Sequence, residues 1–293
     1  MALHADEIAV TVETVQALLA RERPDLARLE IRYLADSGTD SHLFRVGPDH
    51  LVRLPRTPAC SRQIRRDAEL LPHLAGLPME VPRQLHRGGP SSVFGHDWAI
   101  YSWIHGTDGF SQRPAQVLAA LDMAQLITAM HRLPPDILPR SYRDNGRSRT
   151  LADRTDATLK ALAEVADEVP EDAARALWER ALAVPPHDLP VFAHADMHPG
   201  NLVIRDGRIV GVIDFGMALA GDPALDLCPA WTVFETPAAR ARLRDELGVD
   251  DDTWLRGMGW TLSIALVALP YYRGTDSPLA DMARGAIGRL LEA

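Results

Sequence analysis

The chain has 293 residues, 46% of them hydrophobic, which is enough for one large domain or two lobes with a sizeable core. Its 31 Lys and Arg against 40 Asp and Glu give a formal charge of −9, which repels a phosphate backbone. We therefore expect no nucleic-acid partner. The two cysteines, Cys60 and Cys228, are too few for a disulfide framework, which favours a reducing cytoplasm.

The chain also lacks the signs of a membrane partner. Its N-terminus is acidic where a signal peptide is basic. The most apolar segment, residues 260–269, stops at Pro270 and is too short to span a bilayer. We expect a cytoplasmic protein that is a monomer or a weak dimer.

The first hundred residues predict mixed helix and strand. Helices are predicted over residues 6–21 and after Pro58. Short strands are predicted over residues 29–34, 43–46, 51–54, 81–86 and 97–104. The sequence His105-Gly-Thr-Asp-Gly109 then breaks the pattern, and we place the lobe boundary there, between residues 1–104 and 105–293.

A small polar turn, Asp36-Ser-Gly-Thr-Asp-Ser41, separates the first two predicted strands. Its backbone N–H groups are suited to cradle phosphate, with Ser37 and Thr39 as the candidate residues. A single glycine is a weak signal, so the spacing alone favours an ordinary hairpin turn.

Helices are predicted to dominate from Pro114 onward, over residues 114–131, 148–168 and 171–183 and again towards the C-terminus. One β-rich island, residues 191–215, interrupts them. Residues 1–101 carry a net charge of −1 and the rest carry −8. That excess acid is suited to a cationic substrate, and it equally fits a merely solvated acidic surface.

The island ends in a predicted hairpin, because two β-rich runs flank Asp206-Gly207, a type I′ turn signal. If Arg205 faces Arg208, the register places Asn201 opposite Val212. Asn201 and Asp214 then become diagonal neighbours on one face, with Cα atoms about 7–8 Å apart. An amide oxygen and a carboxylate at that spacing can bind one hard cation such as Mg²⁺.

Asp196, five residues before Asn201, is predicted at the same end of the hairpin. A carboxylate beside an Asn/Asp metal pair is what phosphoryl transfer requires, because the metal neutralises the triphosphate while the carboxylate orients the attacking hydroxyl. The alternative is a hairpin with surface polar residues at one end.

The segments His194-Ala-Asp-Met-His-Pro-Gly-Asn201 and Ile213-Asp-Phe-Gly216 resemble the catalytic and metal loops of the aminoglycoside phosphotransferase family, which includes macrolide kinases. The resemblance covers nearly the whole chain. It implies an α+β, protein-kinase-like bilobal fold, with a small N-terminal lobe built on an antiparallel sheet and a larger, mainly helical C-terminal lobe. It further implies that Asp196 is the catalytic base and that Asn201 and Asp214 bind Mg²⁺.

The same resemblance assigns supporting roles. His194 would be a structural member of the loop, and Asp226, which ends Gly221-Asp-Pro-Ala-Leu-Asp226, would brace it. His198 has either a structural role or a substrate contact.

On the nucleotide side, kinases pair a lysine of the third strand with a helix glutamate to hold phosphates. Here Arg53 stands at the lysine position, as in macrolide kinases, and Asp67 stands where the glutamate usually falls, with Glu69 as a rival partner. A surface ion pair is the alternative role of Arg53. The resemblance implies that the Ser102 carbonyl and the Ile104 amide bind the base of ATP or GTP.

The function that the resemblance implies is Mg²⁺-dependent transfer of the γ-phosphate of ATP or GTP to a hydroxyl of an antibiotic, giving resistance. The acidic larger lobe and the Asp-Phe-Gly sequence favour an aminoglycoside. Arg53 and the apolar segment 258–272 favour a macrolide, phosphorylated at its 2′ hydroxyl. Metabolite kinases for choline, homoserine or ketosamines share the fold.

Two other classes remain as alternatives. The missing lysine is compatible with a pseudokinase that binds nucleotide without catalysis. The spacing His194-x-Asp-x-His198 also resembles a metal-ligand cluster of a hydrolase, although it leaves Asn201 and Asp214 without roles.

Overall fold

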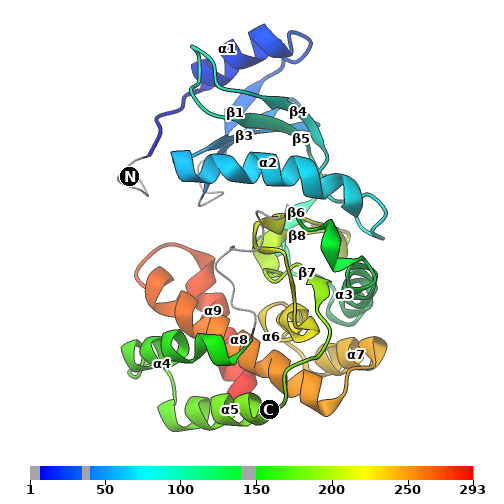
Figure 1. Cartoon of the computed structure of the whole chain (residues 1–293), viewed down its shortest axis with the longest axis vertical. Coiled ribbons are helices and arrows are strands. Elements are labelled where there is room, and N and C mark those ends of the chain that lie inside the picture. Colours follow the sequence, from blue (N-terminus) through cyan, green and yellow to red (C-terminus); the bar gives the residue numbers. More distant parts are fainter. Residues whose placement is uncertain (1–6, 35–39, 140–149, 293) are drawn as a thin grey trace. The chain divides into compact units, whose positions relative to one another are not determined.

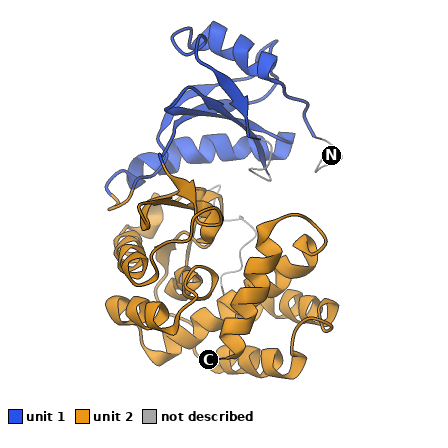
Figure 2. Cartoon of the chain, turned by 180° about the vertical axis from the view of Figure 1, so that it is seen from behind, with its two compact units in different colours: residues 1–76, 80–105 blue, residues 77–79, 106–293 orange. Residues whose placement is uncertain are grey.

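The structure is a computed structural model, and it describes residues 7–34, 40–139 and 150–292. The chain forms two compact units (Figure 2). The first comprises residues 1–76 and 80–105, and the second comprises residues 77–79 and 106–293. The main passage from one unit to the other thus falls between His105 and Gly106, inside the predicted break.

The first unit, coloured from blue to cyan in Figure 1, is built on an antiparallel sheet in the order β1-β2-β3-β5-β4. Its strands are β1 Ile31–Tyr33, β2 Ser41–Val46, β3 His50–Pro55, β4 Gln84–Gly88 and β5 Trp98–Ser102. Two helices, α1 Val12–Glu22 and α2 Ser61–Leu70, accompany the sheet. Because side chains alternate along a strand, Val52 and Leu54 enter the core that also contains Leu18 and Leu19 of α1, whereas Arg53 points to the other face.

The second unit is mainly helical and contains two small sheets. One sheet has the order β6-β8-β9 and the other pairs β7 with β10. The strands are β6 Thr107–Asp108, β7 Val191–Ala193, β8 Leu202–Arg205, β9 Arg208–Val212 and β10 Leu219–Gly221. The helices are α3 Gln116–His131, α4 Thr155–Glu164, α5 Glu171–Ala183, α6 Pro229–Thr232, α7 Pro237–Leu247, α8 Asp251–Tyr272 and α9 Pro278–Leu291.

The long helix α8 forms the centre of the second unit. It packs against α4, α5 and α9, and Trp260, Leu262, Leu266 and Leu269 on it are fully buried. The fold class is confirmed, because an antiparallel sheet forms the first unit and helices dominate the second. Among the residues described, no helix combines the length and apolarity needed to cross a membrane.

Two predicted helices are wrong in their extent. In the described residues, the helix predicted over residues 6–21 begins only at Val12, because the Thr11 side chain caps its N-terminus. In the described residues of the segment 148–168, the α-helix is limited to the ten residues of α4, preceded by a short 3₁₀ turn over Ala152–Arg154. At the C-terminal end, Val165 leaves the helical conformation with φ −122°, and its side chain is fully buried. The periodic apolar pattern continues past Glu164 because the turn itself packs into the core.

The predicted hairpin turn is confirmed. Asp206 and Gly207 have φ values of 52° and 75°, the left-handed pair that a type I′ turn requires. Arg205 faces Arg208, as the turn chemistry predicts. Asp122 of α3 accepts hydrogen bonds from the Arg208 side chain and the Ile209 amide, which fixes the hairpin against that helix.

The register beyond the turn differs from the prediction, which placed Asn201 opposite Val212. Leu202 takes that position, because Val210 has no partner and forms a β-bulge. A glycine inside a strand is a signal for such a bulge, and Gly211 follows Val210 directly. The bulge moves the start of β8 by one residue relative to the end of β9.

Candidate active site

The loop between β7 and β8 begins with a strained residue. Ala195 has φ 62°, a left-handed conformation that costs an alanine about 1–2 kcal/mol. The carboxylate of Asp226 holds this conformation, since its Oδ1 accepts the Ala195 amide at 2.9 Å and its Oδ2 accepts the His194 amide at 3.2 Å. Asp226 is 1% exposed. The structure thus places Asp226 as a brace of this loop.

His194 links this loop to the Asp-Phe-Gly loop. Its imidazole accepts the Asp196 amide at Nδ1 and donates from Nε2 to the Ile213 carbonyl, at 3.3 and 3.1 Å. Its ring packs on Phe215 with centroids 4.6 Å apart. Both ring nitrogens bond the backbone, so His194 has no nitrogen left for a metal. In the described ranges no group of three or more His, Cys, Asp or Glu is placed to hold a metal, which counts against the hydrolase alternative.

Asp196 and Asn201 are in direct contact. The side-chain amide of Asn201 donates to the Asp196 carbonyl at 2.9 Å and to its carboxylate Oδ2 at 3.3 Å. Because a backbone carbonyl can only accept, this bond identifies Nδ2 and turns the amide oxygen of Asn201 away from Asp196. The Asp196 side chain is 27% exposed, so its carboxylate reaches solvent.

Asp214 follows the end of β9 and has φ 60°. Its Oδ1 accepts the Gly216 amide at 3.2 Å. The bulge brings Ile213 opposite Asn201, whose carbonyl accepts the Ile213 amide at 2.9 Å. Asn201 and Asp214 each keep one side-chain oxygen without a hydrogen bond to the described residues, and an amide and a carboxylate oxygen are a donor set that suits Mg²⁺.

His198 stabilises the turn that precedes Asn201. Its Nδ1 accepts the Gly200 amide at 3.1 Å, and its ring packs on Phe110 with centroids 6.1 Å apart. Its Nε2 lies 4.0 Å from Oδ2 of Asp196. These contacts give His198 the structural role, next to the candidate base.

His131 is a residue of this site that the sequence analysis missed. It ends α3, and its Nε2 lies 3.1 Å from Oδ2 of Asp226. The Asp226 carboxylate therefore has His131 on one side and the loop amides on the other. The available signal for His131 was a polar residue at the end of an apolar helix. That signal does not identify Asp226 as its partner, because the two residues are 95 positions apart in the chain.

In the first unit, Arg53 pairs with Asp67, with Nη1 and Oδ2 3.5 Å apart, and its Nε donates to Ser41 at 2.8 Å. Glu69 is exposed on another face of α2. Of the two acids left open by the sequence, Asp67 is therefore the partner of Arg53. The pair is largely buried, with side chains 15% and 6% exposed, so the surface-pair alternative does not describe it.

Asp67 is the centre of a buried cluster. It accepts from the hydroxyl of Tyr101 and from Gln63, both at 2.7 Å. Burial, reinforced by the negative charge of Asp67, raises the pKa of Tyr101 well above its ordinary value, so the phenol remains a donor. The sequence analysis did not predict Tyr101 in this cluster.

The expected base-binding residues lie at the end of β5. Ser102 bonds Arg83 through its amide and its hydroxyl, both at 2.9 Å. Ile104 is buried, and its amide has no hydrogen bond to the described residues. Ser37 and Thr39 lie outside the described residues.

Replacing Asp226 by Asn is expected to lower the free energy of unfolding by about 2–4 kcal/mol. Both carboxylate oxygens of Asp226 accept hydrogen bonds from backbone amides. In either orientation of an Asn side chain, its NH₂ group therefore faces one of these N–H groups, which loses its acceptor. Chemical denaturation measures the loss. Asp281→Asn, at a side chain 87% exposed, is the matched control, and equal stabilities of the two variants would contradict this role of Asp226.

Residues 31–260 match the phosphotransferase enzyme family, and because the match covers most of the chain, the protein belongs to that family. An aminoglycoside 3′-phosphotransferase from Escherichia coli is 36% identical over 83 residues. That segment spans 27% of this chain and 30% of the relative.

Solved structures resemble the chain over nearly its whole length. A GDP and kanamycin complex of APH(2″)-IIia has a TM-score of 0.69 at 18% identity, covering 94% of this chain and 97% of that one. A macrolide 2′-phosphotransferase type I has a TM-score of 0.66 at 20% identity, covering 97% and 98%. These likenesses show the kinase-like fold.

Proposed function

We propose that this enzyme transfers the γ-phosphate of ATP or GTP to a hydroxyl of an aminoglycoside antibiotic, in the cytoplasm, and so gives resistance. The observation that carries the proposal is the contact between Asp196 and Asn201, in a loop bonded through His194 and Asn201 to the loop of Asp214. Membership of the phosphotransferase family supports it.

The candidate site residues of the second unit have distinct roles in the proposed reaction. Asp196 orients the acceptor hydroxyl and takes its proton as the oxygen attacks phosphorus. Asn201 and Asp214 would hold Mg²⁺, which when bound neutralises charge on the transferred phosphate. His194 and Asp226 keep the backbone around Asp196 in its strained form.

In this proposal, residues 1–104 form the lobe that binds the nucleotide. Arg53 binds the α- and β-phosphates, and Asp67 fixes its guanidinium on the sheet face. The Ser102 carbonyl and the Ile104 amide bind the base, and Ser37 and Thr39 contribute to the phosphate turn. Residues 105–293 supply catalysis and the acceptor site.

Charge supports an aminoglycoside as acceptor, because residues 102–293 carry a net −8 and an aminoglycoside is a polycation. The partial match to an aminoglycoside 3′-phosphotransferase supports the same choice. Arg53 in place of lysine and the likeness to a macrolide 2′-phosphotransferase support a macrolide as the second candidate. A metabolite acceptor is the third outcome of the assay.

A nucleotide-turnover assay tests the proposal, with Mg²⁺ present and ATP and GTP in parallel. The acceptors are aminoglycosides, macrolides, choline, homoserine and a ketosamine. Turnover that depends on an aminoglycoside is expected. Turnover with a macrolide or a metabolite instead would overturn the choice of substrate, and nucleotide binding without turnover on any acceptor would indicate a pseudokinase.

Replacing Asp67 by Asn is expected to raise the dissociation constant for nucleotide about tenfold, since Arg53 loses its fixed anionic partner. Glu69→Gln, on the same helix, is the matched control and should leave the constant unchanged. Equilibrium binding of ATP and GTP provides the measurement. A higher dissociation constant in Glu69→Gln and an unchanged one in Asp67→Asn would make Glu69 the functional partner of Arg53.

A further inference from the structure

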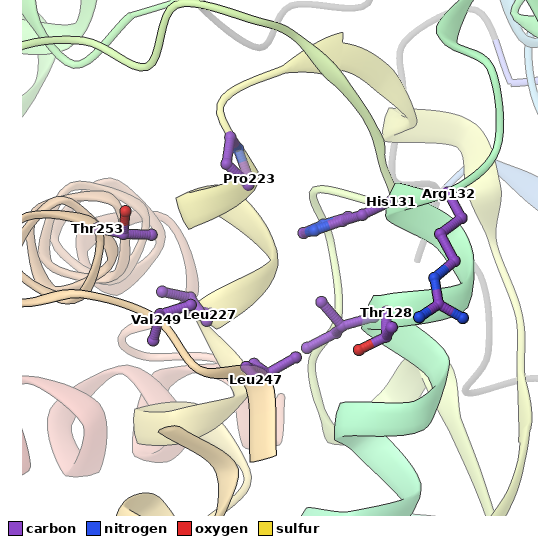
Figure 3. Close-up of a pocket in the computed structure, with 9 residues that line it drawn as sticks. Thr128, His131, Arg132, Pro223, Leu227, Leu247, Val249 and Thr253 are labelled. Atoms are coloured by element: carbon purple, nitrogen blue, oxygen red, sulfur yellow. The ribbon is translucent and has the colours of Figure 1, made fainter. Parts of the chain in front are cut away.

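A cavity of about 250 Å³ lies within the second unit (Figure 3). It is bounded by the C-terminal end of α3, the turn that carries Asp226, and the segment joining α7 to α8. Leu227, Leu247 and Val249 give it an apolar wall. No residue of the 194–201 loop lines it, and His131 is the one lining residue that it shares with the candidate active site.

Arg132 is the one permanently charged side chain in the described lining of the cavity. The residue is exposed, and its guanidinium has no hydrogen bond or ion pair to the described part of the chain. Thr128 lies one helical turn before Arg132, on the same face of α3. The described lining contains no carboxylate, although residues 102–293 carry a net −8. An apolar wall beside one free guanidinium is complementary to an amphiphilic anion.

We propose that this cavity binds a monocarboxylate with an apolar body of about six to ten carbons. The carboxylate pairs with Arg132 while the apolar body lies against Leu227, Leu247 and Val249. A cavity of about 150 Å³ is large enough for benzene, so the larger volume here suits a ring or chain of this size.

The cavity also borders the brace of the catalytic loop. His131 forms part of its wall, and in Figure 3 the imidazole extends from α3 towards Pro223. The same ring bonds Asp226, whose carboxylate accepts the Ala195 amide. A molecule bound in the cavity therefore lies against the wall that contains His131, two hydrogen bonds away from the strained residue before Asp196.

Octanoate is the probe, and its binding to the full chain is measured by calorimetry and by the NMR signals of the His131 imidazole. Saturable binding that shifts those signals is expected. Arg132→Gln should weaken octanoate about fivefold, and Val249→Trp, which fills the cavity, should abolish binding. Arg180→Gln, at an exposed arginine of α5, is the matched control and should have no effect.

Octanol separates the charged from the apolar contribution, because it should bind more weakly than octanoate and be insensitive to Arg132→Gln. No binding of octanoate to the wild-type chain, or binding that neither variant changes, would overturn the proposal. None of these readouts involves phosphate transfer, so the result is independent of the proposed function.

Discussion

Replacing Asp196 by Asn is expected to lower turnover by about 10²–10⁴-fold while nucleotide binding stays nearly intact. The Asn side chain keeps an oxygen that accepts the Asn201 amide, so the loop retains its hydrogen bonds. It cannot take a proton from the acceptor hydroxyl. The change therefore removes the chemical role of residue 196 and preserves its structural one.

Steady-state turnover and nucleotide affinity are measured together on the variant. Asp188→Asn, at an exposed carboxylate before β7, is the control for the loss of one negative charge. Full turnover in Asp196→Asn would remove Asp196 as the base. An equal loss in both variants would point to the net charge of the unit.

The second large effect is expected for Asp214→Asn, with turnover lower by about 10²–10³-fold and a higher Mg²⁺ concentration at half-maximal rate. Asn tolerates the left-handed backbone at φ 60°, and its oxygen still accepts the Gly216 amide. That hydrogen bond leaves the NH₂ group where the second carboxylate oxygen stands. An NH₂ group has no lone pair available for a cation, so this variant lacks the ligand.

The matched control is Asp206→Asn, because Asp206 is also an aspartate in the left-handed region, with φ 52°. It lies in the hairpin turn and should show wild-type turnover and Mg²⁺ dependence. If Asp214→Asn behaves like Asp206→Asn in a Mg²⁺ titration, Asp214 is not a metal ligand.

Local turn chemistry made part of the site predictable. Asp206-Gly207 fixed a hairpin turn, because both residues adopt positive φ readily. The register beyond it was not predictable in the same way, since the bulge at Val210 depends on packing that no local pattern reports. The contact of Asp196 with Asn201 does not depend on the register of β8 and β9, because both residues lie in the loop before β8.

Long-range partners account for what the sequence left open or missed. Asp67 and Glu69 are both acidic residues of α2, so the sequence alone does not show which of them pairs with Arg53. Only the packing of α2 against the sheet face that carries Arg53 distinguishes them. His131 meets Asp226 across 95 positions, and Tyr101 meets Asp67 across 34. The role of Asp226 was accessible through the family resemblance, whereas its histidine partner required the fold.

Mass spectrometry of an aminoglycoside incubated with the protein, Mg²⁺ and a nucleoside triphosphate shows directly whether the protein phosphorylates it. Labelling the γ-phosphate with heavy oxygen identifies the group transferred. The antibiotic is expected to gain one labelled phosphate, and Asp196→Asn is expected to abolish most of the product. An unmodified antibiotic, with the label released as free phosphate or retained on the nucleotide, would contradict this expectation.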